Sequence, residues 1–205
     1  MTASSIPMPR LPSAAVAAAA GWFGLAVLAG ATGFLARLPF PGPQLIILTL
    51  VVATFAAGTL VPALRDWIGA LPIRALIGIN AFRFIGAWFL VIAARGELAP
   101  VFANRAGWGD IATAALALVL VAAGEPRTAT HRALAHAWNA FGLLDLVVAV
   151  ATATWVTLHA VTPGVQPVLT LPLVVIPTFF VPIFLANHVF IFRRLLAAGR
   201  SSDGR

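Results

Sequence analysis

The chain has 205 residues, of which 61% are hydrophobic and only 9% are charged, and its mean hydropathy is +1.00. A soluble domain carries roughly a quarter charged residues, so this composition excludes a water-soluble fold. It predicts a single all-α domain, residues 1–205, built as a polytopic transmembrane helical bundle. The net charge of +7 comes from arginines that fall singly between apolar runs, which is not the clustered pattern of a nucleic-acid-binding face. The absence of cysteine excludes thiol catalysis, disulfides and Cys-ligated metal centres.

Six apolar runs, separated by Arg, Pro and Gly, predict six membrane-spanning helices, since a span needs about 20 apolar residues. The first run is longer than the apolar region of a signal peptide, so we interpret it as a retained helix. The fourth run is the shortest, and the stretch AGWG at 106–109 either completes it or forms an interfacial or re-entrant segment. The predicted spans are about 14–36, 43–63, 73–94, 109–124, 138–159 and 171–192.

The arginines predict that both termini lie in the cytoplasm (N-in, C-in). If the spans alternate in direction, nine arginines fall on the side of the termini and three on the opposite side, and the positive-inside rule places the richer side in the cytoplasm. The use of Arg alone in an Ala-rich chain favours a bacterial protein, and hence the bacterial cytoplasmic (inner) membrane. The nine are Arg10, Arg65, Arg74, Arg127, Arg132, Arg193, Arg194, Arg200 and Arg205, and the three are Arg37, Arg95 and Arg105.

Arg83 and Asp145 are the two charges that we expect inside the membrane. An ionisable side chain in hydrocarbon costs roughly 2.5–3.5 kcal/mol on insertion scales, so it needs a partner and is a functional candidate. Both residues lie in spans that enter from the same side, and at 1.5 Å rise per residue their depths differ by only about 5 Å. We therefore predict an Arg83–Asp145 ion pair inside the bundle, as part of a site or as a structural pair that fixes helix register.

Other polar side chains fall at compatible depths and predict a polar cavity on the cytoplasmic half of the bundle. The sixth predicted span carries Pro177 and Pro182, which free backbone carbonyls and favour a kinked helix beside a pocket or a static kink. The predicted cavity residues are Asn80, Arg83, Asn139, Asp145, Asn187 and His188.

The segment GELAPVFANRAGWGD, residues 96–110, is predicted as a loop on the outer side. Trp108 and Asp110 stand at its end, where Asp110 would cap the free backbone donors of the fourth helix. The competing interpretation is an extracytoplasmic site closed by this loop. No Ser–His–Asp order or paired-carboxylate spacing supports enzyme chemistry there, so the sequence predicts no catalytic residues and makes an enzyme the weaker expectation.

The histidines offer a second interpretation of the bundle. His131 and His136 are five residues apart, about 140° round a helix, whereas ligands that share a helix face are three or four apart. No metal site is therefore predicted. His136 and His188 are both expected toward the cytoplasm, where they could ligate a b-type haem between them; the other interpretation of His188 is a hydrogen-bonded packing residue or a proton relay.

Four stretches of the chain resemble a group of uncharacterised bacterial multi-pass membrane proteins with six helices. They read FRFIGAWFL, AGWGDI, HAWNAFGLLDLVVAV and LPLVVIPTFFVPIFLANHVFIFRRL, and they lie in the latter two thirds of the chain. The resemblance implies a six-helix membrane architecture and no particular activity. Its matching positions are Arg83, Trp108, Gly109, Asp110, Trp138, Asn139, Asp145, Pro177, Pro182 and His188.

These features favour a small transporter or permease-like protein. In this hypothesis a proton-linked charge change at Asp145 or His188 accompanies the movement of a small molecule or ion. The alternatives are a membrane redox protein that binds b-type haem or another cofactor, and a non-catalytic membrane subunit or assembly factor with a membrane-protein partner. Each interpretation places the chain in contact with the lipid bilayer, and none involves nucleic acid.

Overall fold

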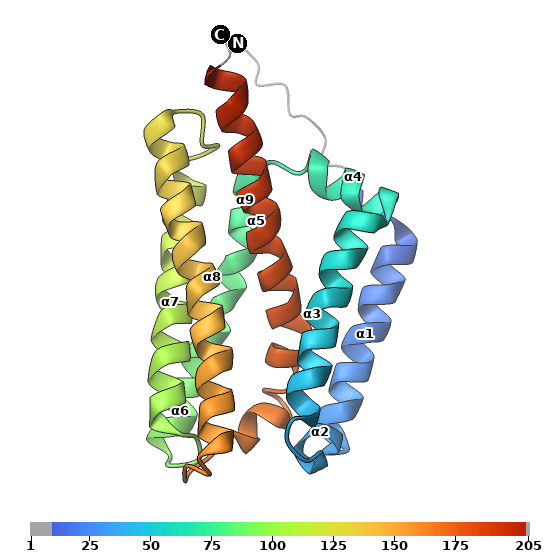
Figure 1. Ribbon diagram of the computed structural model, residues 1–205, viewed down its shortest axis with the longest axis vertical. Coiled ribbons are helices and arrows are strands. Elements are labelled where there is room, and N and C mark those ends of the chain that lie inside the picture. The colour runs from blue at the N-terminus through green and yellow to red at the C-terminus, as the bar shows by residue number, and fades with distance from the viewer. Residues whose placement is uncertain (1–9, 204–205) are drawn as a thin grey trace.

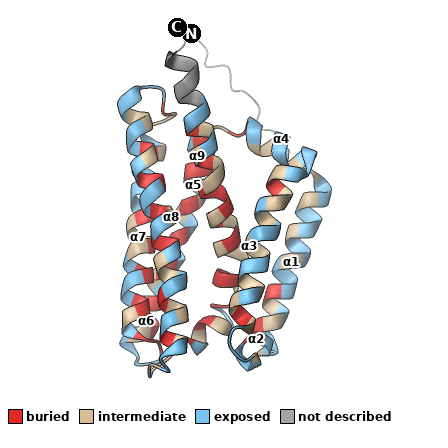
Figure 2. Ribbon diagram, viewed as in Figure 1, coloured by how far each residue is buried: buried red, intermediate tan, exposed pale blue. Residues whose placement is uncertain are grey.

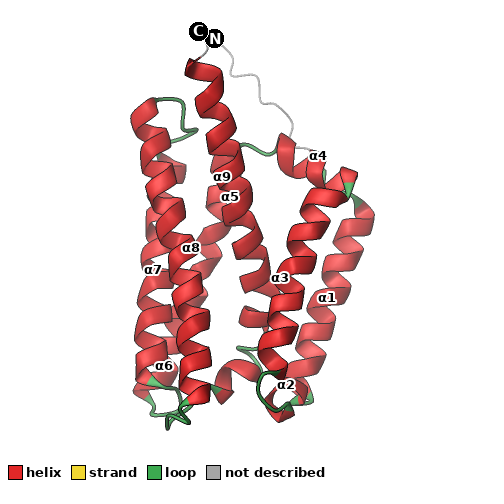
Figure 3. Cartoon of the chain, in the orientation of Figure 1, coloured by secondary structure: helices red, strands yellow, loops and turns green. Residues whose placement is uncertain are grey.

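The computed structural model describes the backbone of residues 10–203 and the side chains of residues 10–197. All regular secondary structure in this range is helical, and none of these residues forms a strand (Figure 3). Six helices are long and apolar enough to cross a membrane, which confirms the all-α fold and the six spans of a multi-pass membrane protein. The spans are α1 (Ser13–Ala31), α3 (Gly42–Leu60), a segment of α5 (Ile73–Gly78), η1 (Ile79–Gly86) and α6 (Ala87–Ala94), then α7 (Pro100–Ala122), α8 (Ala129–Leu158), and η3 (Ile176–Phe180) with α9 (Val181–Asp203).

The first and last spans begin and end at the same end of the bundle (Figure 1), which we call the terminal end. Of the arginines that predict its orientation, Arg205 lies outside the described residues and Arg200 lies beyond the described side chains. The placement of this end in the cytoplasm stays a prediction from the arginine distribution.

Two helices begin well before their predicted first residues. α7 begins at Pro100 rather than 109, and α8 begins at Ala129 rather than 138. Proline suits the first helical turn, where its missing N–H would be unpaired in any case. The hydroxyl of Thr128 caps α8 by accepting the backbone N–H of His131 at 3.1 Å. The stretch at 106–109 is therefore ordinary α-helix that completes the fourth span, and not a re-entrant segment.

A short amphipathic helix, α4 (Pro62–Ala70), occupies part of a predicted loop at the terminal end (Figure 1). Such a helix suits the membrane interface. Arg194 of α9 donates to the carbonyl of Ile68 near its C-terminus at 3.1 Å. In the same region, Glu125 accepts the backbone N–H of Ile73 at 2.8 Å and so caps the start of the third span. Charged side chains thus bind the C-terminal end of α4 and the N-terminal end of α5.

The bundle divides into a peripheral pair of helices, α1 and α3, and the other spans, in which most of the buried residues lie (Figure 2). In the most apolar stretches of α1 and α3, 11% of the residues are buried, against 28–44% in the other four spans. α7 lies against η1, α6 and α8, while α9 contacts both α3 and α8 and so joins the pair to the core. The buried polar side chains in the described residues all belong to the four later spans, which is where a functional site must be sought.

The prolines of the sixth span produce a π-helical turn, η3, ahead of α9. Pro182 has no N–H, so the carbonyl of Thr178, four residues earlier, loses its regular helical partner. The indole Nε1–H of Trp22 in α1 donates to that carbonyl at 2.8 Å, and the Trp22 ring lies 4.8 Å from the ring of Phe179. A proline in one span therefore creates the acceptor on which another span docks.

Trp22→Phe keeps the ring contact but removes the indole donor from the Thr178 carbonyl. We expect it to lower the free energy of unfolding by about 1–2 kcal/mol, measured by SDS or thermal unfolding of the purified protein. Trp108→Phe is the matched control because Trp108 is 61% exposed, and it should change stability by less than about 0.5 kcal/mol. Equal losses in the two variants would contradict the docking role of Trp22.

Candidate functional site

The third span presents its polar side chains from a 3₁₀ segment, η1, which lies between the α-helices α5 and α6. Side chains three residues apart eclipse one another in a 3₁₀ helix. Asn80, Arg83 and Gly86 have this spacing, and they are the buried residues of η1. The intervening Phe82 is 66% exposed and faces outward. The local change of helix type therefore directs both polar side chains of INAFRFIG toward the other spans.

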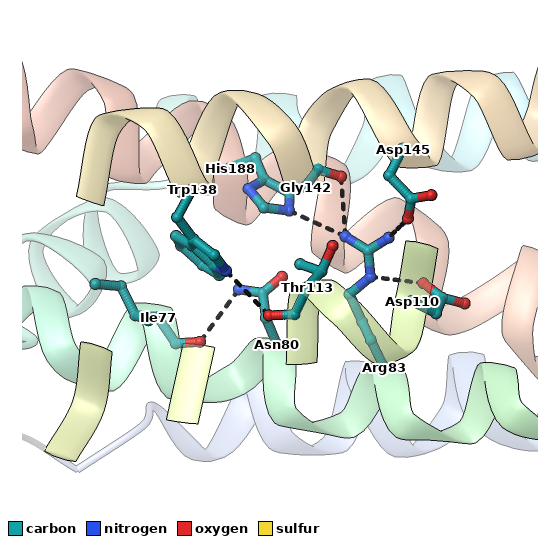
Figure 4. Close-up of polar contacts among 9 residues, drawn as sticks. All are labelled: Ile77, Asn80, Arg83, Asp110, Thr113, Trp138, Gly142, Asp145 and His188. Carbon is teal, nitrogen blue, oxygen red and sulfur yellow. Dashed lines mark hydrogen bonds and ion pairs between the residues drawn. The ribbon is translucent and has the colours of Figure 1, made fainter. Parts of the chain in front are cut away.

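Arg83 is the centre of the buried cluster, and its guanidinium serves four acceptors from three other spans (Figure 4). Nε donates to Oδ1 of Asp110 at 2.7 Å, and Nη1 donates to the carbonyl of Gly142 at 2.9 Å. Nη1 also lies 3.4 Å from Nε2 of His188, and Nη2 pairs with Oδ2 of Asp145. The Arg83–Asp145 pair predicted from the sequence is confirmed, and it is part of a larger network.

Asp110 is the second carboxylate on Arg83, and its predicted place in an outer loop is wrong. Asp110 and Trp108 both lie within α7, where Asp110 is buried against Arg83 and Trp108 faces outward. Asp110 caps no helix. The glycines at 107 and 109 read as loop residues in the sequence, but here they allow helices to approach closely. With both carboxylates ionised, one guanidinium faces two negative charges, so the cluster carries one negative charge in excess.

His188 and Asn139 form a reciprocal pair between α9 and α8. Nδ2 of Asn139 donates to the backbone carbonyl of His188 at 2.9 Å, and Oδ1 lies 2.8 Å from Nδ1 of the ring. Arg83 can only donate, so Nε2 of His188 accepts from it and the ring proton sits on Nδ1, from which it is donated to Asn139. The imidazole in this arrangement is a neutral acceptor toward Arg83.

A second polar group lies next to this pair, at the junction of α5 and η1. Where an α-helix passes into a 3₁₀ helix the hydrogen-bond register changes. The carbonyl of Leu76 accepts there from Nδ2 of Asn187 at 2.8 Å and from Nδ2 of Asn80 at 3.3 Å. Oδ1 of Asn80 and the hydroxyl of Thr113 are buried without a hydrogen-bond partner. The indole of Trp138 donates to the Thr113 carbonyl at 3.0 Å, so this buried tryptophan joins α8 to α7.

Three glycines leave the room that the charged cluster occupies. A Cβ on Gly109 would overlap the carboxyl group of Asp145, and one on Gly142 would lie 2.7 Å from Cε1 of His188. A Cβ on Gly86 would in the same way overlap the carboxyl group of Asp110 in the fourth span. Each glycine belongs to a different span, so the helices approach one another at the level of the charges.

A cavity of about 240 Å³ lies beside the cluster, in the half of the bundle away from the terminal end. Its walls come from α3, α6, α7, α8, the short helix η2 (Gln166–Leu169) and the sixth span. Asp110 is the charged residue among its lining side chains, which are otherwise mainly apolar. The cavity thus meets the ion cluster through one carboxylate.

The six residues predicted to line a cytoplasmic cavity lie in the core, where they are packed in the interior and do not surround a shared cavity. None of Asn80, Arg83, Asn139, Asp145 or His188 lines the cavity beside Asp110. Asn187 lies at the edge of a separate apolar hollow of about 500 Å³ between α1, α3, α4 and α9. All six side chains are buried, with His188 and Arg83 fully enclosed. The cavity itself therefore differs in place from the predicted one.

The haem alternative, with His136 and His188 as ligands, stays a prediction. Both ring nitrogens of His188 are engaged, with Asn139 and Arg83, so haem ligation would require one of these contacts to break. The ring of His136 lies 5.9 Å from that of Phe192 on the neighbouring α9. No contact of His136 brings it to the ion cluster in the described part of the chain.

The fold and the buried cluster define an integral membrane protein of six apolar helices with an arginine-centred polar site. The sequence pattern of a family described as Domain of unknown function (DUF8737) matches residues 40–196. Because this match covers more than half of the chain, the protein belongs to that family. The match runs from just before α3 into α9 and includes every residue of the ion cluster. Comparison with curated proteins and with solved structures finds no match.

Gly109→Ala tests whether the close approach of the fourth and fifth spans supports the cluster. The added methyl group must displace the Asp145 carboxyl group, so we expect a loss of about 1–3 kcal/mol in the free energy of unfolding. Gly24→Ala in α1 is the matched control, because a Cβ there meets no atom within 4 Å and alanine favours helix by up to about 1 kcal/mol. If the two variants unfold alike, the glycine has no such role.

Arg83→Lys tests the geometry of the guanidinium apart from its charge. Lysine keeps the charge but lacks the planar fork that serves the Gly142 carbonyl and both carboxylates at once. Each buried acceptor left unpaired costs about 1–3 kcal/mol, so we expect a clear fall in the unfolding midpoint. Arg65→Lys is the control, since the Arg65 side chain is 57% exposed. Wild-type stability in Arg83→Lys would show that charge alone suffices.

Proposed function

We propose that this chain is a small proton- or cation-linked transporter of the bacterial cytoplasmic membrane, with both termini in the cytoplasm. The observation that carries the proposal is the sharing of Arg83 by Asp110 and Asp145. An unbalanced charge buried among apolar helices is costly. A proton or a bound cation at one carboxylate balances the excess negative charge, so the cluster has two states that differ by one charge.

The position of Asp110 supports a link between those states and a solute. Asp110 belongs both to the ion cluster and to the wall of the cavity. A solute in the cavity that binds best to the ionised Asp110 carboxylate promotes loss of the proton from Asp110. Protonation of Asp110 in turn lowers the affinity for that solute. Such reciprocity is a thermodynamic requirement whenever two ligands share one group.

Two irregular helix segments at the level of this site further support a transport role. η1 carries Arg83, and η3 contributes Ile176 and Pro177 to the cavity wall. Non-helical or distorted backbone at membrane depth is tolerated where it is buried in protein or lines a cavity, and interrupted helices are a common feature of transporter sites. The arginine distribution would place the cavity on the outer half of the membrane.

Purified protein in proteoliposomes that contain a pH-sensitive dye tests the proposal. Neutral, anionic and cationic solutes are added in turn, with quaternary rather than primary amines, since neutral primary amines cross bilayers unaided. We expect protein-dependent proton movement with one solute class and its loss in Asp145→Asn, because that variant removes a charge from the cluster.

Asp66→Asn provides the control, since Asp66 is exposed on α4 and pairs with Arg65. It should transport like wild type. Absence of proton movement with every solute, or equal movement in Asp145→Asn and wild type, would exclude a proton-linked transporter that works through this cluster.

A further inference from the structure

Apart from the side-chain N–H₂ of Gln44, the polar side chains in the cavity wall offer hydrogen-bond acceptors to a ligand. Oδ1 of Asp110 accepts from Arg83, while its Oδ2 receives no hydrogen bond from the described residues. Oε1 of Gln44 is buried and has no partner. The hydroxyls of Thr154 and Thr157 donate to carbonyls of their own helix at 2.9 Å, which leaves only their lone pairs for a ligand. The wall therefore suits a ligand that donates.

The charge of the wall selects a cation. Asp110 is the charged group of the cavity lining, and the cluster behind it carries an excess negative charge when both carboxylates are ionised. A positive group at Asp110 balances that charge, whereas an anion would add to it. Neutral solutes leave it unbalanced.

The rest of the wall selects an apolar body. Phe89 and Phe102 line the cavity with ring centroids 5.2 Å apart, and most of the remaining wall is aliphatic. Hard divalent cations need six or more oxygen ligands, which this wall does not supply. The volume of about 240 Å³ corresponds to roughly eight water molecules at about 30 Å³ each, enough for a small ring or a short alkyl chain.

The rim of the cavity reaches the lipid-facing surface between α3 and α8. Leu48 of α3 and Val150 of α8 both line the cavity, and they are 57% and 40% exposed. A molecule with an apolar body concentrates in the bilayer, so this rim gives it a lateral route from the lipid to Asp110.

We propose that the cavity binds a small amphiphilic organic cation. Its ammonium group lies at Asp110 and donates to the free carboxylate oxygen, and its apolar body lies between Phe89, Phe102 and the aliphatic side chains of α3 and α8. The inference rests on the proposed function, for which it names the substrate class.

Equilibrium dialysis against the full chain in lipid nanodiscs tests the inference, with empty nanodiscs subtracted for partition into lipid. The probes are labelled benzylammonium, its neutral analogue benzyl alcohol, and the anion benzoate, all at pH 7. We expect benzylammonium to bind at least about tenfold more tightly than benzyl alcohol, given the strength of close charge pairs, and benzoate not to bind. Asp110→Asn should reduce that preference to within about twofold.

Ala153→Phe provides a second variant because Ala153 lines the cavity from α8, so the larger side chain fills the cavity while every charged residue is kept. It should abolish binding of both benzylammonium and benzyl alcohol, while Asp66→Asn on the exposed helix α4 should bind like wild type. Equal binding of the cation and the alcohol by wild type would overturn the inference. So would wild-type binding by Ala153→Phe, or an undiminished cation preference in Asp110→Asn.

The failure of this inference is distinguishable from the failure of the proposed function. Selective benzylammonium binding without proton-linked flux of any solute would support the cation site and exclude the proton-linked transporter. Proton-linked flux of a neutral or anionic solute that depends on Asp145, without benzylammonium binding, would leave the transporter and exclude the cation site.

Discussion

The Arg83 guanidinium is the constraint on which the polar core depends. Its planar group has fixed donor directions, and it reaches Asp110 on α7, Asp145 and the Gly142 carbonyl on α8, and His188 on α9. A buried charge cannot be left unpaired in hydrocarbon, so these contacts set the depth at which four spans meet. The glycines at the same level follow from this requirement, because a Cβ at Gly109 would displace a carboxyl group that Arg83 needs.

Irregular backbone supports this arrangement at two places. In η1 the 3₁₀ spacing aligns Asn80 directly with Arg83 on one buried face, whereas a regular α-helix would leave the two side chains about 60° apart around its axis. In the sixth span, Pro182 removes a helical hydrogen bond, and the freed Thr178 carbonyl accepts from Trp22. The first span thereby docks on the core although it lies outside the residues that match the family. Each departure from α-geometry is compensated by a specific contact.

The sequence predicts the six spans well, because apolar length is a direct requirement of the bilayer. It also predicts the Arg83–Asp145 pair, since two isolated charges at similar depth have few other partners. It fails at Asp110, which follows a Gly-Trp-Gly stretch typical of a loop, and therefore misses the second carboxylate. The late predicted starts of α7 and α8 have the same cause, since Arg105 and the polar stretch before Trp138 read as aqueous. Glycines that make room for charges give no signal until the helices are placed together.

The cluster separates two unlike halves of the core. Toward the terminal end, Asn80, Asn139 and Asn187 fill the interior with amide contacts, and Oδ1 of Asn80 and the Thr113 hydroxyl remain buried without partners. On the other side lies an apolar cavity whose charge comes from Asp110. Arg83 and its carboxylates connect the two through polar contacts. A change in the charge of Asp110 must therefore alter the strength of its contact with Arg83, and through the guanidinium the contacts to Asp145 and His188. The Arg83 side chain is therefore a direct polar route for coupling between the two halves.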